Sequence, residues 1–131
     1  AQAYSFIKRK AKRFEEPISE GGANMSGGQK QRLSIARAIV RKPEIYIFDD
    51  SFSALDFKTD ATLRAKLKEE TTDAVVLVVA QRIGSIIEAD QIIVLNEGEV
   101  VGSGKHEELL RNCEIYKEIA LSQLSKEELM L

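Results

Sequence analysis

Two short, almost continuous apolar runs most constrain the fold of this chain. Residues 44–50 read Glu-Ile-Tyr-Ile-Phe-Asp-Asp, and residues 74–80 read Ala-Val-Val-Leu-Val-Val-Ala. Runs of this kind are typical of strands that are covered on both faces of a parallel sheet. The stretch between them, about 59–70, has a helical pattern, so the three segments predict a strand–helix–strand crossover unit. Ligands of such sheets bind beyond the carboxyl ends of the strands.

The rest of the chain also alternates between helix and strand patterns, which predicts an α/β fold. Residues 1–7 read as the middle of a helix, and 15–28 is a polar, Gly- and Pro-containing stretch that predicts a loop. Residues 29–41 have helical apolar spacing and end before Pro43. The C-terminal part predicts a β-hairpin from 91–95 and 99–101 around Asn96-Glu97-Gly98, then helices at about 105–112 and 114–123.

Charge and composition narrow the class of protein. A formal net charge of −2 over 131 residues gives no general electrostatic reason to expect nucleic-acid binding. The longest apolar run, 74–80, is far shorter than the ~20 residues that cross a bilayer. The single Cys113 cannot form an internal disulfide, which favours a reducing, cytoplasmic setting.

A glycine pair, Gly27-Gly28, stands where the helix over 29–41 is expected to begin. Glycines leave backbone N–H groups uncovered, and the positive end of a helix dipole favours an anion, so this N-terminus suits phosphate. The Ser26 hydroxyl adds a donor, and Ser26 with Gln29 forms the pattern of a capping box. Taken alone, the segment is equally consistent with a well-capped helix that binds nothing.

The full segment, Asn24-Met25-Ser26-Gly27-Gly28-Gln29-Lys30-Gln31-Arg32, resembles the signature of the ABC ATPase family. That signature is usually Leu-Ser-Gly-Gly-Gln followed by a helix with Gln-Arg, and Met for Leu conserves apolar volume. The resemblance implies the C-terminal part of a P-loop NTPase (RecA-like) domain with part of the helical signature subdomain. It also implies that four residues contact the ATP of a second nucleotide-binding domain: Ser26, Gly27, Gly28 and Gln29.

Two further elements of the family follow at the expected distance. Residues 45–49 resemble the Walker B strand, which implies that Asp49 holds Mg²⁺ through water. The plainer alternative is an Asp that only caps the next loop. Next comes a segment that resembles the D-loop, which touches the opposite subunit: Ser53, Ala54, Leu55 and Asp56.

Two positions depart from the hydrolytic pattern of the family. The acid after Walker B is usually Glu and is here Asp50; losing one methylene withdraws the carboxylate by about 1.5 Å, which can cost on the order of 10²-fold in rate. The switch histidine is replaced by Gln81, which can donate a hydrogen bond but cannot become cationic near neutral pH. We therefore expect Asp50 and Gln81 to form a degenerate catalytic pair. The lone His106 is expected to begin a helix, not to catalyse.

No Gly-x-x-x-x-Gly-Lys-Ser/Thr segment occurs in the chain. The P-loop is therefore expected in an N-terminal half that precedes Ala1, and the fragment alone should lack ATPase activity and expose part of its apolar sheet. The expected organisation is residues 1–42 as part of the helical subdomain, 43–124 as the C-terminal part of the RecA-like core, and 125–131 as a tail.

Residues 17–24 resemble the X-loop of exporter-type nucleotide-binding domains, which faces the coupling helices of a transmembrane domain. Glu20 is the matching acid, although Gly22 stands where a basic residue is common. In such exporters two nucleotide-binding domains pack head to tail. The resemblance therefore implies ATP- and Mg²⁺-dependent export at the cytoplasmic face of the membrane by a heterodimer of multidrug type, with the transmembrane domain on the same polypeptide.

Two alternative functions stay open. A non-hydrolysing regulatory subunit would also carry the pair Asp50 and Gln81. An ABC ATPase of DNA repair or chromosome organisation would share the signature and Walker B, and its basic surface would be formed by Lys8, Arg9, Lys10, Lys12 and Arg13. Such a run is more often a solvated helix face.

Overall fold

The computed structural model describes residues 1–124 and divides into two compact units, Ala1–Val79 and Ala80–Leu131. Both helices and strands are present, so the predicted α/β class is confirmed. The tail predicted for 125–131 lies outside the described residues. None of the helices in residues 1–124 is long and apolar enough to cross a membrane.

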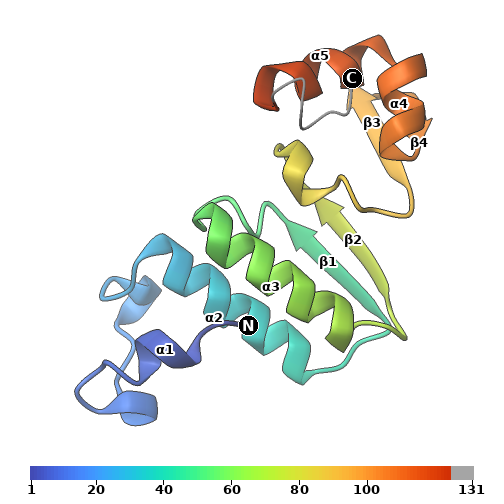
Figure 1. Ribbon diagram of the computed structural model, residues 1–131. Coiled ribbons are helices and arrows are strands. Elements are labelled where there is room, and N and C mark those ends of the chain that lie inside the picture. The colour runs from blue at the N-terminus through green and yellow to red at the C-terminus, as the bar shows by residue number, and fades with distance from the viewer. Residues whose placement is uncertain (125–131) are drawn as a thin grey trace. The chain divides into compact units, whose positions relative to one another are not determined.

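The first unit contains three helices, two short 3₁₀ turns and two parallel strands (Figure 1). The helix predicted over residues 1–7 is shorter in the structure and starts only at Tyr4. The elements, in chain order, are α1 (Tyr4–Ile7), η1 (Arg13–Glu15), η2 (Glu20–Gly22), α2 (Gly27–Val40), β1 (Ile45–Asp49), α3 (Phe57–Glu70) and β2 (Val75–Val79).

The core of this unit lies between the two long helices and one face of the sheet (Figure 1). α2 contributes Ile35, and α3 contributes Leu63, which is fully buried. β1 alternates between exposed and buried positions, and its buried side chains are Tyr46 and Phe48. Since successive side chains of a strand point to opposite faces, only one face of β1 is covered.

The two strands pair in parallel, as the crossover prediction requires, with Ile47 opposite Leu77. The expectation that both strands are covered on both faces is wrong, whereas the expectation that the chain alone exposes part of its apolar sheet is confirmed. Ile47 is 66% and Leu77 50% exposed, and most of β2 is exposed along its length. The physical reason is that the helices of this unit cover one face of a sheet of two strands, so the apolar side chains on the other face have no neighbours to pack against.

In the described part of the second unit, residues 80–124, a hairpin is covered by two helices. Glu97 and Gly98 both have positive φ, as tight hairpin turns require. Its core includes Val94 from the hairpin and Tyr116 from the last helix. The predicted hairpin and the two predicted helices are confirmed as β3 (Ile92–Asn96), β4 (Glu99–Gly104), α4 (His106–Asn112) and α5 (Glu114–Gln123). A short turn that was not predicted, η3 (Ile83–Ser85), precedes them.

Candidate functional site

Ser26 closes the N-terminus of α2. Its Oγ accepts a hydrogen bond from the backbone N–H of Gln29 at 3.3 Å, and the Gln29 side-chain oxygen accepts one from the backbone N–H of Ser26 at 3.1 Å. The predicted capping box is confirmed. Because the first N–H groups of a helix have no acceptor within the helix, those of Gly27 and Gly28 are placed to bind an anion.

The two glycines have different surroundings. A Cβ on Gly28 would lie 2.8 Å from the carbonyl oxygen of Ala54 and 3.3 Å from Cδ2 of Leu55. A Cβ on Gly27 would meet the Ala54 Cβ at 3.4 Å, which is an ordinary contact. Glycine at position 28 therefore allows the segment 53–56 to pack directly on α2. The structure brings together the predicted signature and the predicted D-loop.

Gln31 joins the same two segments and was not among the predicted site residues. Its Nε2 donates hydrogen bonds to the carbonyl oxygen of Asp50 at 3.2 Å and to Ser53 Oγ at 3.1 Å. Its Oε1 accepts one from the backbone N–H of Ala54 at 3.0 Å. The resemblance places Gln31 in the Gln-Arg pair of the signature helix but assigns it no role, and its contacts were not predicted because its partners lie far along the chain.

The acidic pair follows β1 directly. Asp49 is the last residue of the strand, and its carboxylate is exposed. Asp50 has φ 45°, a left-handed conformation that is uncommon outside glycine and tolerated best by Asn and Asp. The Asp50 N–H donates to the carbonyl oxygen of Val79 at 3.0 Å, and its carbonyl oxygen also accepts from Ser53 Oγ at 3.0 Å. The backbone of Asp50 is thus fixed while its carboxylate faces solvent.

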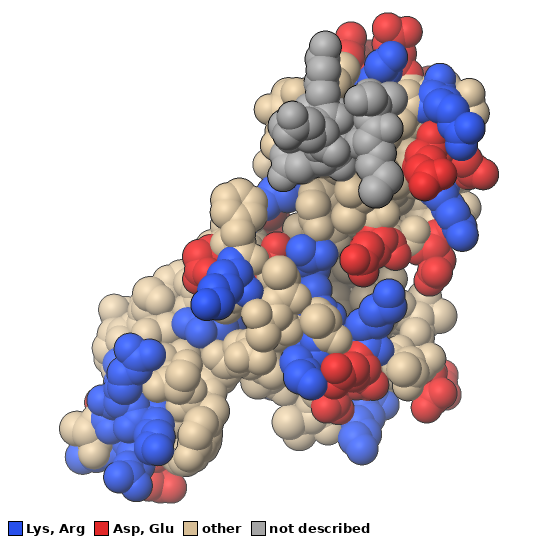
Figure 2. Space-filling view, viewed as in Figure 1, with Lys and Arg blue, Asp and Glu red and all other residues tan. Residues whose placement is uncertain are grey.

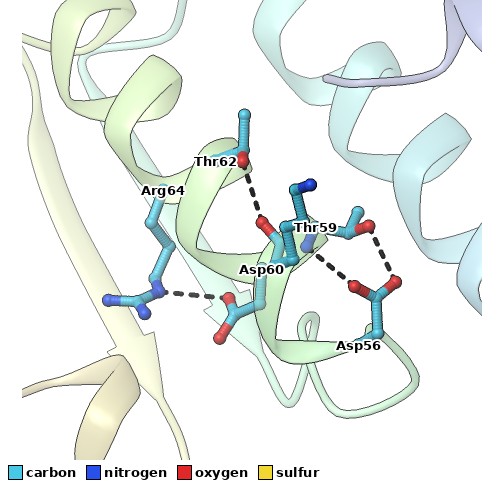
Figure 3. Close-up of polar contacts among 6 residues, drawn as sticks. Asp56, Thr59, Asp60, Thr62 and Arg64 are labelled. Carbon is cyan, nitrogen blue, oxygen red and sulfur yellow. Dashed lines mark hydrogen bonds and ion pairs between the residues drawn. The ribbon is translucent and has the colours of Figure 1, made fainter.

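The segment 53–56 ends at the start of α3 (Figure 3). Asp56 caps this helix, since one carboxylate oxygen accepts from the Thr59 backbone N–H at 2.9 Å and the other from the Thr59 hydroxyl at 2.7 Å. These hydrogen bonds, the backbone one first, lower the pKa of Asp56. Through its two hydrogen bonds to Thr59, Asp56 anchors the loop to α3. Further along the helix, buried Asp60 forms an ion pair with Arg64 at 3.1 Å.

Glu20 is exposed at the first position of η2. Gly21 and Gly22 both have positive φ, so the glycine at position 22, where a basic residue is common, suits the turn of the backbone. Lys30 Nζ donates to the carbonyl oxygen of Gly21 at 2.9 Å. Asn24 closes the loop by bonding back to its beginning: its Oδ1 accepts from the Ser19 N–H and its Nδ2 donates to the Pro17 carbonyl oxygen. The loop that carries Glu20 is thereby tied to the first turn of α2.

Basic side chains gather over the α1–η1 end of the first unit (Figure 2). Part of this basic cluster borders a hollow of about 380 Å³ beside Gln29. Two of its lining residues contact each other, since the guanidinium carbon of Arg32 lies over the Phe6 ring, 4.8 Å from its centroid. The lining residues are Ser5, Phe6, Arg9, Lys10, Gln29 and Arg32, which bring cations and no carboxylate to the signature end of α2.

Gln81 lies at the start of the second unit, where its side chain is exposed. Its carbonyl oxygen accepts a hydrogen bond from Gln123 Nε2 at 2.8 Å, and Gln123 Oε1 accepts one from the Ile83 N–H at 2.9 Å. The amide of Gln123 in α5 thus fixes the backbone that presents Gln81.

His106 begins α4, as predicted from the sequence. Its Nδ1 lies 2.7 Å from the Tyr116 hydroxyl, and the two rings meet edge to face. Burial lowers the pKa of His106 and raises the pKa of Tyr116 to about 12. This pair joins α4 to α5 and was not foreseen. Its contacts and its burial are those of a structural pair.

Comparisons with known proteins agree with the signature. A family profile described as "ABC transporter" matches residues 1–53. The chain is 54% identical, over 81% of its length, to an uncharacterized ABC transporter ATP-binding protein of Mycobacterium tuberculosis. It is 41% identical, over 94% of its length, to human ATP-binding cassette sub-family B member 5.

The fold also matches a solved structure, a bacterial Atm1-family ABC exporter with ATP bound. The match has a TM-score of 0.88 and 33% sequence identity, and it covers 92% of this chain. The chain spans 18% of the mycobacterial relative, 10% of the human one and 21% of the exporter chain. It therefore corresponds to about a fifth or less of each of these proteins.

Proposed function

Because this chain is part of the ATP-binding domain of an ABC transporter, we propose that it completes the ATP site of a second nucleotide-binding domain in an exporter. The observation that carries this proposal is the packing of Gly28 against Ala54. It brings the signature end of α2 and the D-loop together in the same unit. In the family, both elements serve nucleotide across the interface between two domains.

The signature end of α2 has the chemistry that a triphosphate needs. Ser26 and the N–H groups of Gly27 and Gly28 supply donors at the positive end of a helix of 14 residues. The capping box occupies the Oε1 of Gln29, so this residue would reach nucleotide through its Nε2. The cations around the neighbouring hollow add positive potential on the same side.

The carboxyl end of β1 has the chemistry that Mg²⁺ needs. Mg²⁺ prefers oxygen ligands and is commonly held by one or two carboxylates together with substrate phosphates. Asp49 offers one exposed carboxylate at the carboxyl end of a parallel strand. Within residues 1–124 no three His, Cys, Asp or Glu side chains cluster as a complete metal site. Asp49 would therefore hold the ion through water, together with the nucleotide.

We propose that the chain's own catalytic side is degenerate. Asp50 stands where the family has Glu, and its backbone is held by Gln31, Ser53 and Val79, so a shorter side chain is not compensated by a mobile backbone. Gln81 replaces the switch histidine and cannot supply a positive charge. Hydrolysis would then occur mainly at the site to which this chain contributes its signature, in a heterodimeric exporter of multidrug type.

The parent protein would act at the cytoplasmic face of a membrane. The loop around Glu20 would contact the coupling helices of a transmembrane domain, and the tie from Lys30 to Gly21 would carry that contact to the signature. Residues 1–42 would belong to the helical subdomain and 43–124 to the RecA-like core. A non-hydrolysing regulatory subunit is the second candidate, favoured by the same pair, Asp50 and Gln81.

The test is ATP turnover by the full-length transporter assembled with its second nucleotide-binding domain. Ser26→Arg places bulk where the other domain's nucleotide would lie, and turnover should fall at least about 10²-fold. Ser34→Ala, an exposed position on the same helix, is the control and should leave turnover unchanged. Near-normal turnover of Ser26→Arg would show that this signature serves no active site.

A further inference from the structure

We propose that Gln31 is a positioning residue that locks the D-loop (53–56) to α2 and to the backbone of Asp50. The signature, the D-loop and the acidic position would then move as one block. The catalytic consequence rests on the proposed function, whereas the lock itself rests on the geometry of the first unit alone.

The hydrogen bonds of Gln31 use the whole side-chain amide. An amide has one oxygen and two N–H donors. The oxygen accepts from the Ala54 N–H, while the nitrogen donates to the Asp50 carbonyl and to Ser53 Oγ. Glu would keep only the acceptor, and Met would keep neither function. The site therefore requires both a donor and an acceptor at this side-chain length.

The surroundings of the loop explain why one side chain can set its position. Phe52 and Leu55 are 4% and 5% exposed and anchor the loop on either side. Ser53 and Ala54, between these anchors, are exposed and contact Gln31. The Gly28 backbone packs directly against Ala54, so the loop already contacts α2. The side-chain amide of Gln31 then fixes the position of the loop along the helix.

This arrangement links two nucleotide sites through one residue. The signature and D-loop would serve the nucleotide of the second domain, while Asp50 belongs to the chain's own catalytic side. A displacement of the order of 1 Å in a catalytic assembly can cost about 10²-fold in rate. Loss of the Gln31 bonds should therefore affect turnover more than nucleotide affinity, which depends mainly on motifs outside this segment.

The experiment compares three variants of the full-length transporter assembled with its second domain. Gln31→Met removes all three hydrogen bonds at nearly constant length, and Gln31→Glu keeps the acceptor for the Ala54 N–H. Gln91→Met is the matched control, because Gln91 Nε2 also donates to a serine hydroxyl, that of Ser103, at 3.0 Å in the hairpin of the second unit.

Hydrogen exchange tests the lock directly. In Gln31→Met the amide of Ala54 should exchange roughly two- to tenfold faster, which corresponds to the loss of one ordinary hydrogen bond. Gln31→Glu should lie between Gln31→Met and the wild type. The amides of β1 should keep their rates in every variant, and Gln91→Met should leave the D-loop unchanged. Unchanged Ala54 exchange in both Gln31 variants would overturn the proposal.

Turnover tests the consequence. The kcat of Gln31→Met should fall about 10- to 100-fold, with KM for ATP within about a factor of two, and Gln31→Glu should recover part of the loss. A merely structural role of Gln31 would lower the amount of folded transporter and leave the kcat per folded transporter unchanged. Faster D-loop exchange with unchanged kcat also overturns the proposal. If the wild-type assembly shows no turnover, the proposed function fails, and the exchange comparison still decides whether Gln31 holds the loop.

Discussion

Gly28 lies so close to Ala54 that a Cβ on the glycine would be 2.8 Å from the alanine carbonyl oxygen. Gly27, one residue earlier, has room for a methyl group, since its Cβ would lie 3.4 Å from the Ala54 Cβ. The two adjacent glycines therefore differ in how closely the segment 53–56 approaches them. Only the second must lack a side chain for this segment to pack on α2.

This difference predicts that the same substitution destabilises the domain at position 28 and has little effect at position 27. Gly28→Ala should destabilise the nucleotide-binding domain by about 1–3 kcal/mol, because the loop must shift to admit the methyl group. Gly27→Ala should leave stability within about 0.5 kcal/mol. Thermal unfolding of the complete domain measures both, and a shift of several degrees is expected for Gly28→Ala alone. Equal unfolding temperatures for the two variants would contradict the close packing.

The pair His106 and Tyr116 predicts a pH dependence of stability. Burial lowers the pKa of His106 below its ordinary value of 6.5, so the unfolded chain binds the proton more readily than the folded one. Stability from neutral His106 is fully present above pH 6.5 and is lost as the pH falls through the lowered pKa.

The variant His106→Gln cannot titrate and isolates this effect. Its unfolding temperature should fall less steeply than that of the wild type from about pH 7 to about pH 5. Above about pH 7 the unfolding temperatures of the two proteins should change with pH in parallel and differ only by a constant offset. Parallel curves through the acidic range would mean that His106 does not contribute to acid sensitivity.

The open face of the sheet predicts the behaviour of the 131-residue chain on its own. Exposed apolar side chains on paired strands favour association, and the chain contains no P-loop motif. The purified chain should therefore self-associate and show no ATP turnover. Ile47→Lys with Leu77→Lys, opposite each other in the sheet, should reduce association in sedimentation measurements. Robust turnover by this chain would contradict the view that essential chemistry lies elsewhere.

Local signals in the sequence predicted local structure well. The capping box at Ser26 and the turn at Glu97 and Gly98 depend on residues within a few positions of each other, and both are confirmed. The predicted ends of α2 and α3 agree with the observed ends to within about two residues, because capping residues and Pro43 mark where these helices begin and end.

Features that depend on distant residues were missed or misjudged. Gln31 meets partners about 20 residues later, and His106 meets Tyr116 across two helices, so neither bond leaves a pattern in the sequence. The strand β2 was predicted to be buried from its apolar run alone. Burial depends on what covers the sheet, and periodicity cannot reveal that.

The proposal that Asp50 and Gln81 each weaken the chain's own catalytic side, while its signature serves the other domain, is tested most directly by repair. The full-length heterodimer carries Asp50→Glu and Gln81→His, singly and together, while the catalytic glutamate of the second domain is disabled. Glu would return the carboxylate to the attacking water, and His would return a titratable donor to the γ-phosphate. Single-turnover hydrolysis then reports the repaired site alone.

The double variant should hydrolyse bound ATP about 10²-fold faster than the unrepaired site. Its gain should exceed the sum of the gains of the two single variants, because residues that act on one transition state are not additive. A repaired site that binds ATP and remains silent would contradict the account, since the cause of the degeneracy would then lie outside Asp50 and Gln81.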